Sequence, residues 1–204
     1  MSNSEQAIRR EQAIRLAKQD TPAALACARD IEEPWYRCQA LAWVANFAPE
    51  MEVVLIATEA LQAAAQGADG YQRVAAAAWP IRALVERSFV EQADQAAACV
   101  LPTAGEIEHP GSRAEAPLLL LHATLPSPQG WRPVFERILE IPQPPTHWRH
   151  GRALRDACLM VHVIDPAFFA SRLQRVIDPK TRRRIDKGIA DPDSRHRGSR
   201  EFFW

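Results

Sequence analysis

Glycine is scarce in this sequence, with 8 among 204 residues, and the glycine-rich signatures of catalysis and nucleotide binding are missing. There is no G-x-x-x-x-G-K-[ST] loop and no G-x-S-x-G turn. Cys158 and His162 stand four residues apart, but in an apolar stretch whose burial argues against an activated thiol. We therefore expect a protein that is not an enzyme, with neither catalytic residues nor a cofactor.

Cysteine is also sparse, and no pair has the C-x-x-C spacing of a metal or redox site. Most of the cysteines lie in alanine- or leucine-rich helical runs, where cysteine behaves as a small hydrophobic residue. We expect all of them to be reduced and buried, in a cytoplasmic protein. They are Cys27, Cys38, Cys99 and Cys158.

Long hydrophobic runs are missing as well. The longest uncharged apolar stretches, such as residues 74–81 and 116–121, fall far short of the roughly 20 residues that a membrane span needs. Residues 1–10 are polar and charged, which argues against a signal peptide. The sequence predicts a soluble chain without a membrane partner.

An excess of one charge is absent too, because the formal net charge is zero and the pI is about 7.0. Bulk charge therefore gives no argument for nucleic acid or a membrane surface. The distribution is uneven: from Pro179 on, 8 basic residues stand against 4 acidic ones, and the remainder holds 17 against 21. The pattern is a mildly acidic body with a basic tail.

A repeated segment is the strongest positive signal. Residues 31–37 and 107–113 both read Ile, acid, any residue, Pro, two residues, Arg. Degraded copies begin at Gly67, Ile141 and Ile177, which gives spacings of 36, 40, 34 and 36 residues. A period in this range is typical of helical-repeat solenoids.

Proline and apolar periodicity divide the chain into helices. A capping helix is predicted over 3–18, a last first-type helix over 166–177, and a basic helix after Pro179. The predicted helix pairs are 22–31 with 34–48, 50–66 with 70–87, 91–105 with 110–124, and 130–140 with 145–163. We expect a single repeat domain over 1–204, with the cap in 1–19, hairpin repeats in 20–178, and a basic cap and tail in 179–204.

The segments that begin at Ile31 and Ile107 resemble the helical hairpins of HEAT-like and tetratricopeptide-like α-solenoids. The likeness is greatest to the bacterial type that reads I-[ED]-x-P-x-x-R-A-x-A-L. This resemblance implies an all-α, right-handed superhelix of about four helical hairpins, with an N-terminal capping helix and a basic C-terminal cap. It also implies a scaffolding role. The expected function is protein binding through the concave face, as an adaptor, an inhibitor or immunity-like protein, or a regulatory subunit.

An arginine recurs near the start of the second helix in the first three pairs and again in the basic helix after Pro179. A cation there opposes the helix dipole, so we expect compensating acids just upstream, such as Glu33 and Asp69. Two interpretations stay open: the arginines clamp the turn between helices, which is favoured, or they form a ladder that binds an acidic partner. The repeated residues are Arg37, Arg73, Arg113 and Arg183.

The tryptophans fall into two groups. Trp43 and Trp79 hold equivalent repeat positions and are predicted to lie in the core. Trp35, Trp131 and Trp148 lie at helix starts beside prolines. They pack between repeats or, in the alternative, stay partly exposed as interface anchors.

The histidines give a weak metal signal. His147 and His150 have a zinc-ligand spacing on one helical face, with His109 or Glu106 as conceivable further ligands. Solvated histidines at a helix start are the simpler interpretation, so no metal is predicted. The other histidines in apolar helices, His122 and His162, are expected to be core residues.

The C-terminal segment offers the alternative partner. Residues 180–187 could contact phosphates, although Arg182, Arg183 and Arg184 point in different directions on a helix, so nucleic-acid binding is the alternative function. The chain ends in an aromatic cluster that either folds back over the exposed end of the stack, which is slightly favoured, or plugs another molecule. Docking on a neighbouring copy would give a homodimer. The cluster is Phe202, Phe203 and Trp204.

Overall fold

The computed structural model describes residues 2–142, 148–191 and 203, and every regular element within these ranges is a helix. The all-α prediction is therefore confirmed. The elements are α1 (Asn3–Ala17), α2 (Thr21–Arg29), α3 (Pro34–Phe47), α4 (Glu50–Ala65), α5 (Gly70–Glu86), α6 (Val90–Val100), the 3-10 helix η1 (Leu101–Glu106), α7 (Pro110–Thr124), α8 (Pro128–Glu140), α9 (Trp148–Ile164), α10 (Pro166–Arg172), the 3-10 helix η2 (Leu173–Arg175) and α11 (Pro179–Ala190).

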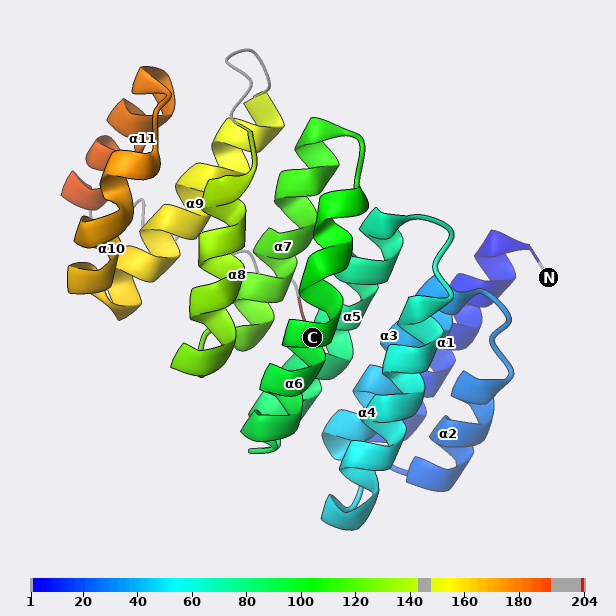
Figure 1. Cartoon of the computed structure of the whole chain (residues 1–204). Helices are drawn as coiled ribbons and strands as arrows, with labels where there is room; N and C mark the ends of the chain where they lie inside the picture. The colour runs from blue at the N-terminus through cyan, green and yellow to red at the C-terminus, as the bar shows by residue number, and fades with distance from the viewer. Residues whose placement is uncertain (1, 143–147, 192–202, 204) are drawn as a thin grey trace.

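The helices are arranged in two layers (Figure 1). The odd-numbered helices form one continuous row, in which α1 packs on α3, α3 on α5, α5 on α7, α7 on α9 and α9 on α11. The second layer contains α2, α4, α6 and α8, each packed mainly on the odd-numbered helix that precedes it in the chain and also on the one that follows. Within the described ranges, none of the helices has the length and apolar character that crossing a membrane requires.

Several helix starts follow directly from the sequence. The side chains of Asp20, Asp69, Ser127 and Asp165 each accept a hydrogen bond from a backbone N–H in the first turn that follows. These side chains satisfy amides that have no partner within the helix. Proline at the first or second helical position, as in α3 and α7, adds a preset backbone angle without losing a useful donor.

The core of the odd-numbered row is built from alanine. Residues 75–78 of α5 are four consecutive alanines, each at most 1% exposed, so this helix is covered on all sides there. Ala40, Ala42 and Ala45 of α3 are equally buried. Small side chains let neighbouring helix axes approach closely, which is what a helix with neighbours on both flanks requires.

Two helix ends differ from the prediction, and each has a local cause. The helix expected over 91–105 ends as α-helix at Val100 and continues as η1, because Pro102 has no N–H to donate to the carbonyl four residues earlier. The helix expected over 166–177 ends at Arg172 and tightens into η2. Residues three apart align in such a turn, and Arg172 and Arg175 both donate to Glu136 of α8.

Arg87 ties one hairpin to the preceding one. Its Nη1 atom donates to the carbonyls of Ala45, Asn46 and Ala48 at 3.3, 2.9 and 2.8 Å. These carbonyls lie at the end of α3, where no later helical amide is available to them. The C-cap residue of α5 therefore also caps the helix before it in the row.

A buried proline and a buried thiol are coupled across α3 and α5. Pro80 lies inside α5 and cannot donate to the carbonyl of Ala76, four residues earlier. The Sγ of Cys38, from α3, donates to that carbonyl at 3.3 Å. The thiol thus satisfies an acceptor that the proline leaves without its helical partner.

Ser88 is the one described non-glycine residue with a positive φ, at 67°. It follows the C-cap of α5, where the amides of Ser88 and Phe89 donate to the carbonyls of Val85 and Leu84, the bond pattern of a Schellman motif. A residue with a Cβ atom is sterically strained in this left-handed conformation, and glycine avoids that strain.

We predict that Ser88→Gly raises the free energy of unfolding by about 0.5–1 kcal/mol, because the left-handed backbone there loses its steric penalty. The measurement is urea unfolding followed by circular dichroism. Ala98→Gly is the control, since Ala98 is an exposed residue inside α6, and it should destabilise by about 1 kcal/mol. If both variants changed the free energy of unfolding in the same direction, the steric penalty at Ser88 would not be the cause.

Candidate functional site

An apolar groove lies on the second layer, between α4 and α6, with α5 as its floor. Its volume is about 420 Å³, which is within the range of about 300–1,000 Å³ typical of ligand-binding clefts. Leu61, Ala96 and Val100 are half-buried apolar residues of its walls. The complete lining is Thr58, Leu61, Gln62, Ala64, Ala65, Arg73, Ala77, Ala96, Cys99, Val100 and Thr103.

The α4–α6 groove continues into an exposed apolar strip on α4. Met51 and Leu55, one helical turn apart, are 91% and 72% exposed. Thr58 and Gln62 follow on the same helical face and belong to the groove lining. Exposed apolar residues beside an apolar groove make this face a candidate site of interaction.

The charge of the groove walls has one sign. The elements α4, α6 and η1 contain acidic residues but no lysine or arginine. The floor contributes one cation, Arg73, which forms a 3.0 Å ion pair with Glu106 at the end of η1. Glu50, Glu52 and Glu91 are exposed at the starts of α4 and α6. The groove lining is therefore apolar, with Arg73 as its charged residue, whereas the helices α4 and α6 that flank it carry net negative charge.

The side-chain partners of Arg37, Arg73 and Arg113 are not the upstream carboxylates that the sequence suggested. Arg37 donates to Gln66 and Arg73 to Glu106, both of which end the first helix of the next hairpin. Arg113 donates to the carbonyls of Ile107 and Glu108 in its own turn, as the clamp interpretation predicts. The sequence suggested ion-pair partners close to each arginine along the chain. Stacking of the hairpins instead brings Gln66 and Glu106, each one hairpin away, within hydrogen-bond distance of Arg37 and Arg73.

The last repeated arginine follows neither pattern. Arg183 bonds the carbonyl of Pro179, one turn earlier in α11, at 3.3 Å.

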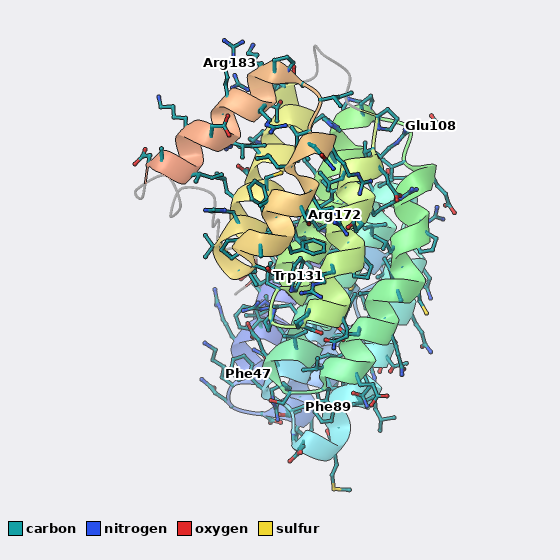
Figure 2. The ribbon with its side chains drawn as sticks, turned by 60° about the vertical axis from the view of Figure 1, so that its left-hand side comes forward. Phe47, Phe89, Glu108, Trp131, Arg172 and Arg183 are labelled. Atoms are coloured by element: carbon teal, nitrogen blue, oxygen red, sulfur yellow. The ribbon has the colours of Figure 1, made fainter. Side chains whose placement is uncertain are left out.

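Trp131 is the clearest correction among the candidate interface residues. It is 1% exposed, with its ring edge-on to Phe168 of α10 at a centroid distance of 5.2 Å (Figure 2). Trp148 is 62% exposed and has the guanidinium groups of Arg149 and Arg152 over its ring. Trp35 is half-buried at the start of α3. Of these residues, Trp131 is therefore a core residue and not an exposed anchor.

The two tryptophans expected in the core are only half-buried. Trp43 stacks on Phe47 at 5.9 Å, with the Lys18 ammonium 5.8 Å from its ring centroid. Trp79 meets Phe203 edge-on at 5.1 Å. Phe203 thus packs on α5, in the middle of the row, and not over the exposed end of the stack as the fold-back alternative expected. Phe202 and Trp204 lie outside the described residues.

The cysteines are free thiols, but their burial varies more than expected. Cys38 and Cys158 are buried, and burial raises the pKa of the Cys158 thiol to about 12. Cys27 is half-buried, and Cys99 is exposed in the wall of the α4–α6 groove. The expectation that all four are buried is wrong for Cys99, because an alanine-rich helix can present its small residues to a groove.

Metal binding finds no support in the part of the chain that is described, where no three His, Cys, Asp or Glu side chains are placed to hold an ion. His150 is 2% exposed at the start of α9, and His147 lies outside the described residues. His162 meets the ring of Phe169 edge-on at 5.2 Å.

The basic helix α11 has a single cationic face. Its buried positions are Thr181, Ile185 and Gly188, and the intermediate Arg182 donates to the Leu173 carbonyl at 3.1 Å. Four exposed basic residues share the remaining surface at helical spacing, and Arg183 points outward in Figure 2. They are Lys180, Arg183, Arg184 and Lys187. The sequence pointed to the consecutive residues Arg182, Arg183 and Arg184, and this four-residue stripe was not predicted.

Comparison with known proteins returned no matching family model, curated protein or solved structure. The resemblance of the repeats to HEAT-like and tetratricopeptide-like proteins therefore stays a prediction.

His122 provides a pH-dependent contribution to stability. Burial, with a smaller effect of the Arg82 guanidinium, lowers the pKa of its imidazole from 6.5 to about 4. The unfolded chain therefore binds a proton at higher pH than the folded chain does. The stabilisation is complete above pH 6.5 and is lost as the pH falls toward 4.

We predict that His122→Gln reduces the loss of unfolding free energy between pH 7.5 and pH 4 by about 2–3 kcal/mol, because no imidazole remains to be protonated. Urea titrations of both proteins at several pH values measure the difference. Parallel pH curves for the two proteins would show that His122 does not titrate between the two states.

Proposed function

We propose that this chain is a non-catalytic protein-binding scaffold, an adaptor or regulatory subunit, built as an α-solenoid of about four hairpins. The order of packing supports the architecture, since each odd-numbered helix contacts the next one in the row. Polar bonds between hairpins support it further. Arg29–Glu59, Arg73–Glu106 and Arg132–Asp165 join residues 30, 33 and 33 apart, close to one repeat. A solenoid of this kind offers extended surfaces for binding.

The observation that carries the binding role is the α4–α6 groove, an apolar cleft between two helices that carry net negative charge. The resemblance alone suggested the concave face of a solenoid, whereas the groove is the surface whose chemistry points to an occupant. We propose that it holds an amphipathic helix of a partner protein, with apolar residues in the groove and basic residues toward the walls.

Charge and shape both favour a basic helix. The groove lining includes Thr58 and Ala65 on α4, which span about two helical turns, enough for apolar residues at i, i+3 or i+4, and i+7 of a docked helix. Exposed Glu50, Glu52 and Glu91 would attract lysine or arginine on the sides of that helix. An acidic helix would meet like charge on both walls.

We predict that a helical leucine–lysine peptide of about 15 residues binds the full chain at least about ten-fold more tightly than a leucine–glutamate peptide with the same apolar face. Fluorescence anisotropy of the labelled peptides measures both affinities. Binding of the basic peptide should weaken as salt is added, because the wall charges are exposed to solvent.

Thr58→Arg is the test of location, since Thr58 is an exposed residue of the groove lining. It should weaken binding of the basic peptide about ten-fold by adding a like charge and filling the groove. Gln174→Arg on η2 adds the same charge away from the groove and should change the affinity less than two-fold, or about 0.4 kcal/mol. Equal losses in both variants, or equal binding of the acidic peptide, would exclude the groove as the site.

Nucleic-acid binding through residues 180–187 remains a second candidate, favoured by the exposed cationic stripe on α11. A stripe on one face of a helix can follow a line of phosphates. We predict a salt-sensitive gel shift with duplex nucleic acid that is lost when Arg183 and Arg184 are changed to alanine. Arg37→Ala, a half-buried arginine distant in sequence, is the control. Absence of a shift at low salt would remove this candidate.

A further inference from the structure

A second pocket lies where the turns of the first two hairpins meet, and it shares no lining residue with the α4–α6 groove. It has a volume of about 370 Å³. The repeat explains its composition, because residues 33, 35 and 36 lie 36 positions before residues 69, 71 and 72. Stacked hairpins bring such equivalent positions side by side. The lining is Asn3, Glu33, Trp35, Tyr36, Asp69, Tyr71 and Gln72.

Three of these side chains are aromatic. Trp35, Tyr36 and Tyr71 bring ring surface from two successive helices to one small volume. The faces of aromatic rings carry partial negative charge and attract cations, and tryptophan does so most strongly. One ring of this set already has a cation beside it: the guanidinium carbon of Arg10 lies 5.5 Å from the centroid of Tyr36.

Two carboxylates also line the pocket, and the structure fixes the backbone of Glu33 and the carboxylate of Asp69. The amides of Glu32 and Glu33 donate to Oε1 of the buried Gln6 at 3.1 and 3.4 Å, which fixes the backbone that carries Glu33. Asp69 Oδ1 accepts the amide of Gln72 at 2.7 Å as the N-cap of α5. The lining contains no lysine, arginine or histidine to neutralise these two groups.

The surroundings of Tyr71 are also negative overall. Burial raises the pKa of its phenol above the ordinary value, and the carboxylates of Glu115 and Asp69 raise it further, while Arg149 acts in the opposite direction. A cation that enters the pocket would therefore meet acidic groups as well as aromatic faces.

The third hairpin lacks these features. With a shift of 40 residues, the positions equivalent to Asp69, Tyr71 and Gln72 correspond to His109, Gly111 and Ser112. No phenol or indole ring and no carboxylate stands at those positions. The combination belongs to the first two hairpins alone, so the general needs of turn stacking do not account for it.

We infer that this pocket binds an organic ammonium group, held by the rings of Trp35, Tyr36 and Tyr71 and by the carboxylates of Glu33 and Asp69. Alkylated ammonium groups suit such a site, because they combine a positive charge with apolar surface that loses little hydration energy against aromatic rings. The group belongs either to a small quaternary amine or to a lysine side chain of a peptide, since both present the same chemistry.

Choline is the first probe, and dimethylbutanol, in which carbon replaces the charged nitrogen, is its neutral counterpart. Titration calorimetry with the full chain gives the affinities, and proton NMR follows the choline methyl signal, which shifts upfield when the group lies over aromatic rings. We expect choline to bind at least about ten-fold more tightly than the neutral counterpart. Equal binding of the two molecules would overturn the inference.

The charge variant is Glu33→Gln with Asp69→Asn, which removes both carboxylates while asparagine keeps the N-cap acceptor. It should weaken choline binding about ten-fold. Glu108→Gln with Asp186→Asn removes the same two charges from exposed sites outside the pocket and should change binding less than two-fold, or about 0.4 kcal/mol. Equal effects of the two double variants would overturn the inference.

The aromatic arm uses Trp35→Leu, which should abolish the upfield shift of the methyl signal. Trp35 also packs against buried residues of the core, so the charge variants decide the outcome if this protein does not fold.

Capped tripeptides with lysine or trimethyllysine at their centre identify the source of the group. A trimethyllysine peptide that binds more tightly than choline indicates a protein ligand, and the reverse order indicates a free amine. Absence of binding by choline and by both peptides at millimolar concentrations would overturn the inference.

Discussion

The close approach of the odd-numbered helices is the constraint on which the rest of the structure depends. α3 and α5 each have a helix of the same row on both flanks, so little room is left for side chains between their axes. Residues 75–78 of α5 meet this constraint with four buried alanines. A large residue there would separate the helices and strain every contact along the row, including the bonds of Arg87 to the end of α3. Alanine composition is thus a geometric requirement of the fold as well as a helix-forming preference.

Both candidate sites follow from this row. Because α5 supports α4 and α6 from beneath, those two helices need not contact each other tightly, and the α4–α6 groove lies between them. Because successive hairpins are stacked with similar spacing, their turns align and place Glu33 near Asp69 and Trp35 near Tyr71. The α4–α6 groove exists because the second layer leaves part of α5 without a covering helix. The pocket at the turns exists because the same repeat positions recur in two successive hairpins. Neither requires a catalytic group.

Helix type and most helix bounds were predictable from the sequence, because proline, N-cap residues and apolar periodicity act locally. The second helix of the first hairpin was predicted over 34–48 and is found at Pro34–Phe47. Trp131 was not predictable in the same way, since its burial depends on Phe168, from another helix. The exposure of Cys99 was not predictable for the same reason. Cys99 lines the α4–α6 groove, which depends on the spacing of two helices. The pairs of equivalent residues were visible in the repeat, but their convergence on one pocket required the angle and distance between hairpins.

The bond between Cys38 and the Ala76 carbonyl has an evolutionary consequence. Pro80 is tolerated inside α5 because a donor from α3 satisfies the acceptor that the proline abandons. A descendant that replaced Pro80 with an ordinary residue would restore the helical donor, and selection to keep a thiol at position 38 would relax. A descendant that lost Cys38 first would bury an unpaired carbonyl. The order of substitution is therefore constrained, and among relatives these two positions, 42 apart in the chain, should change together or with the proline first.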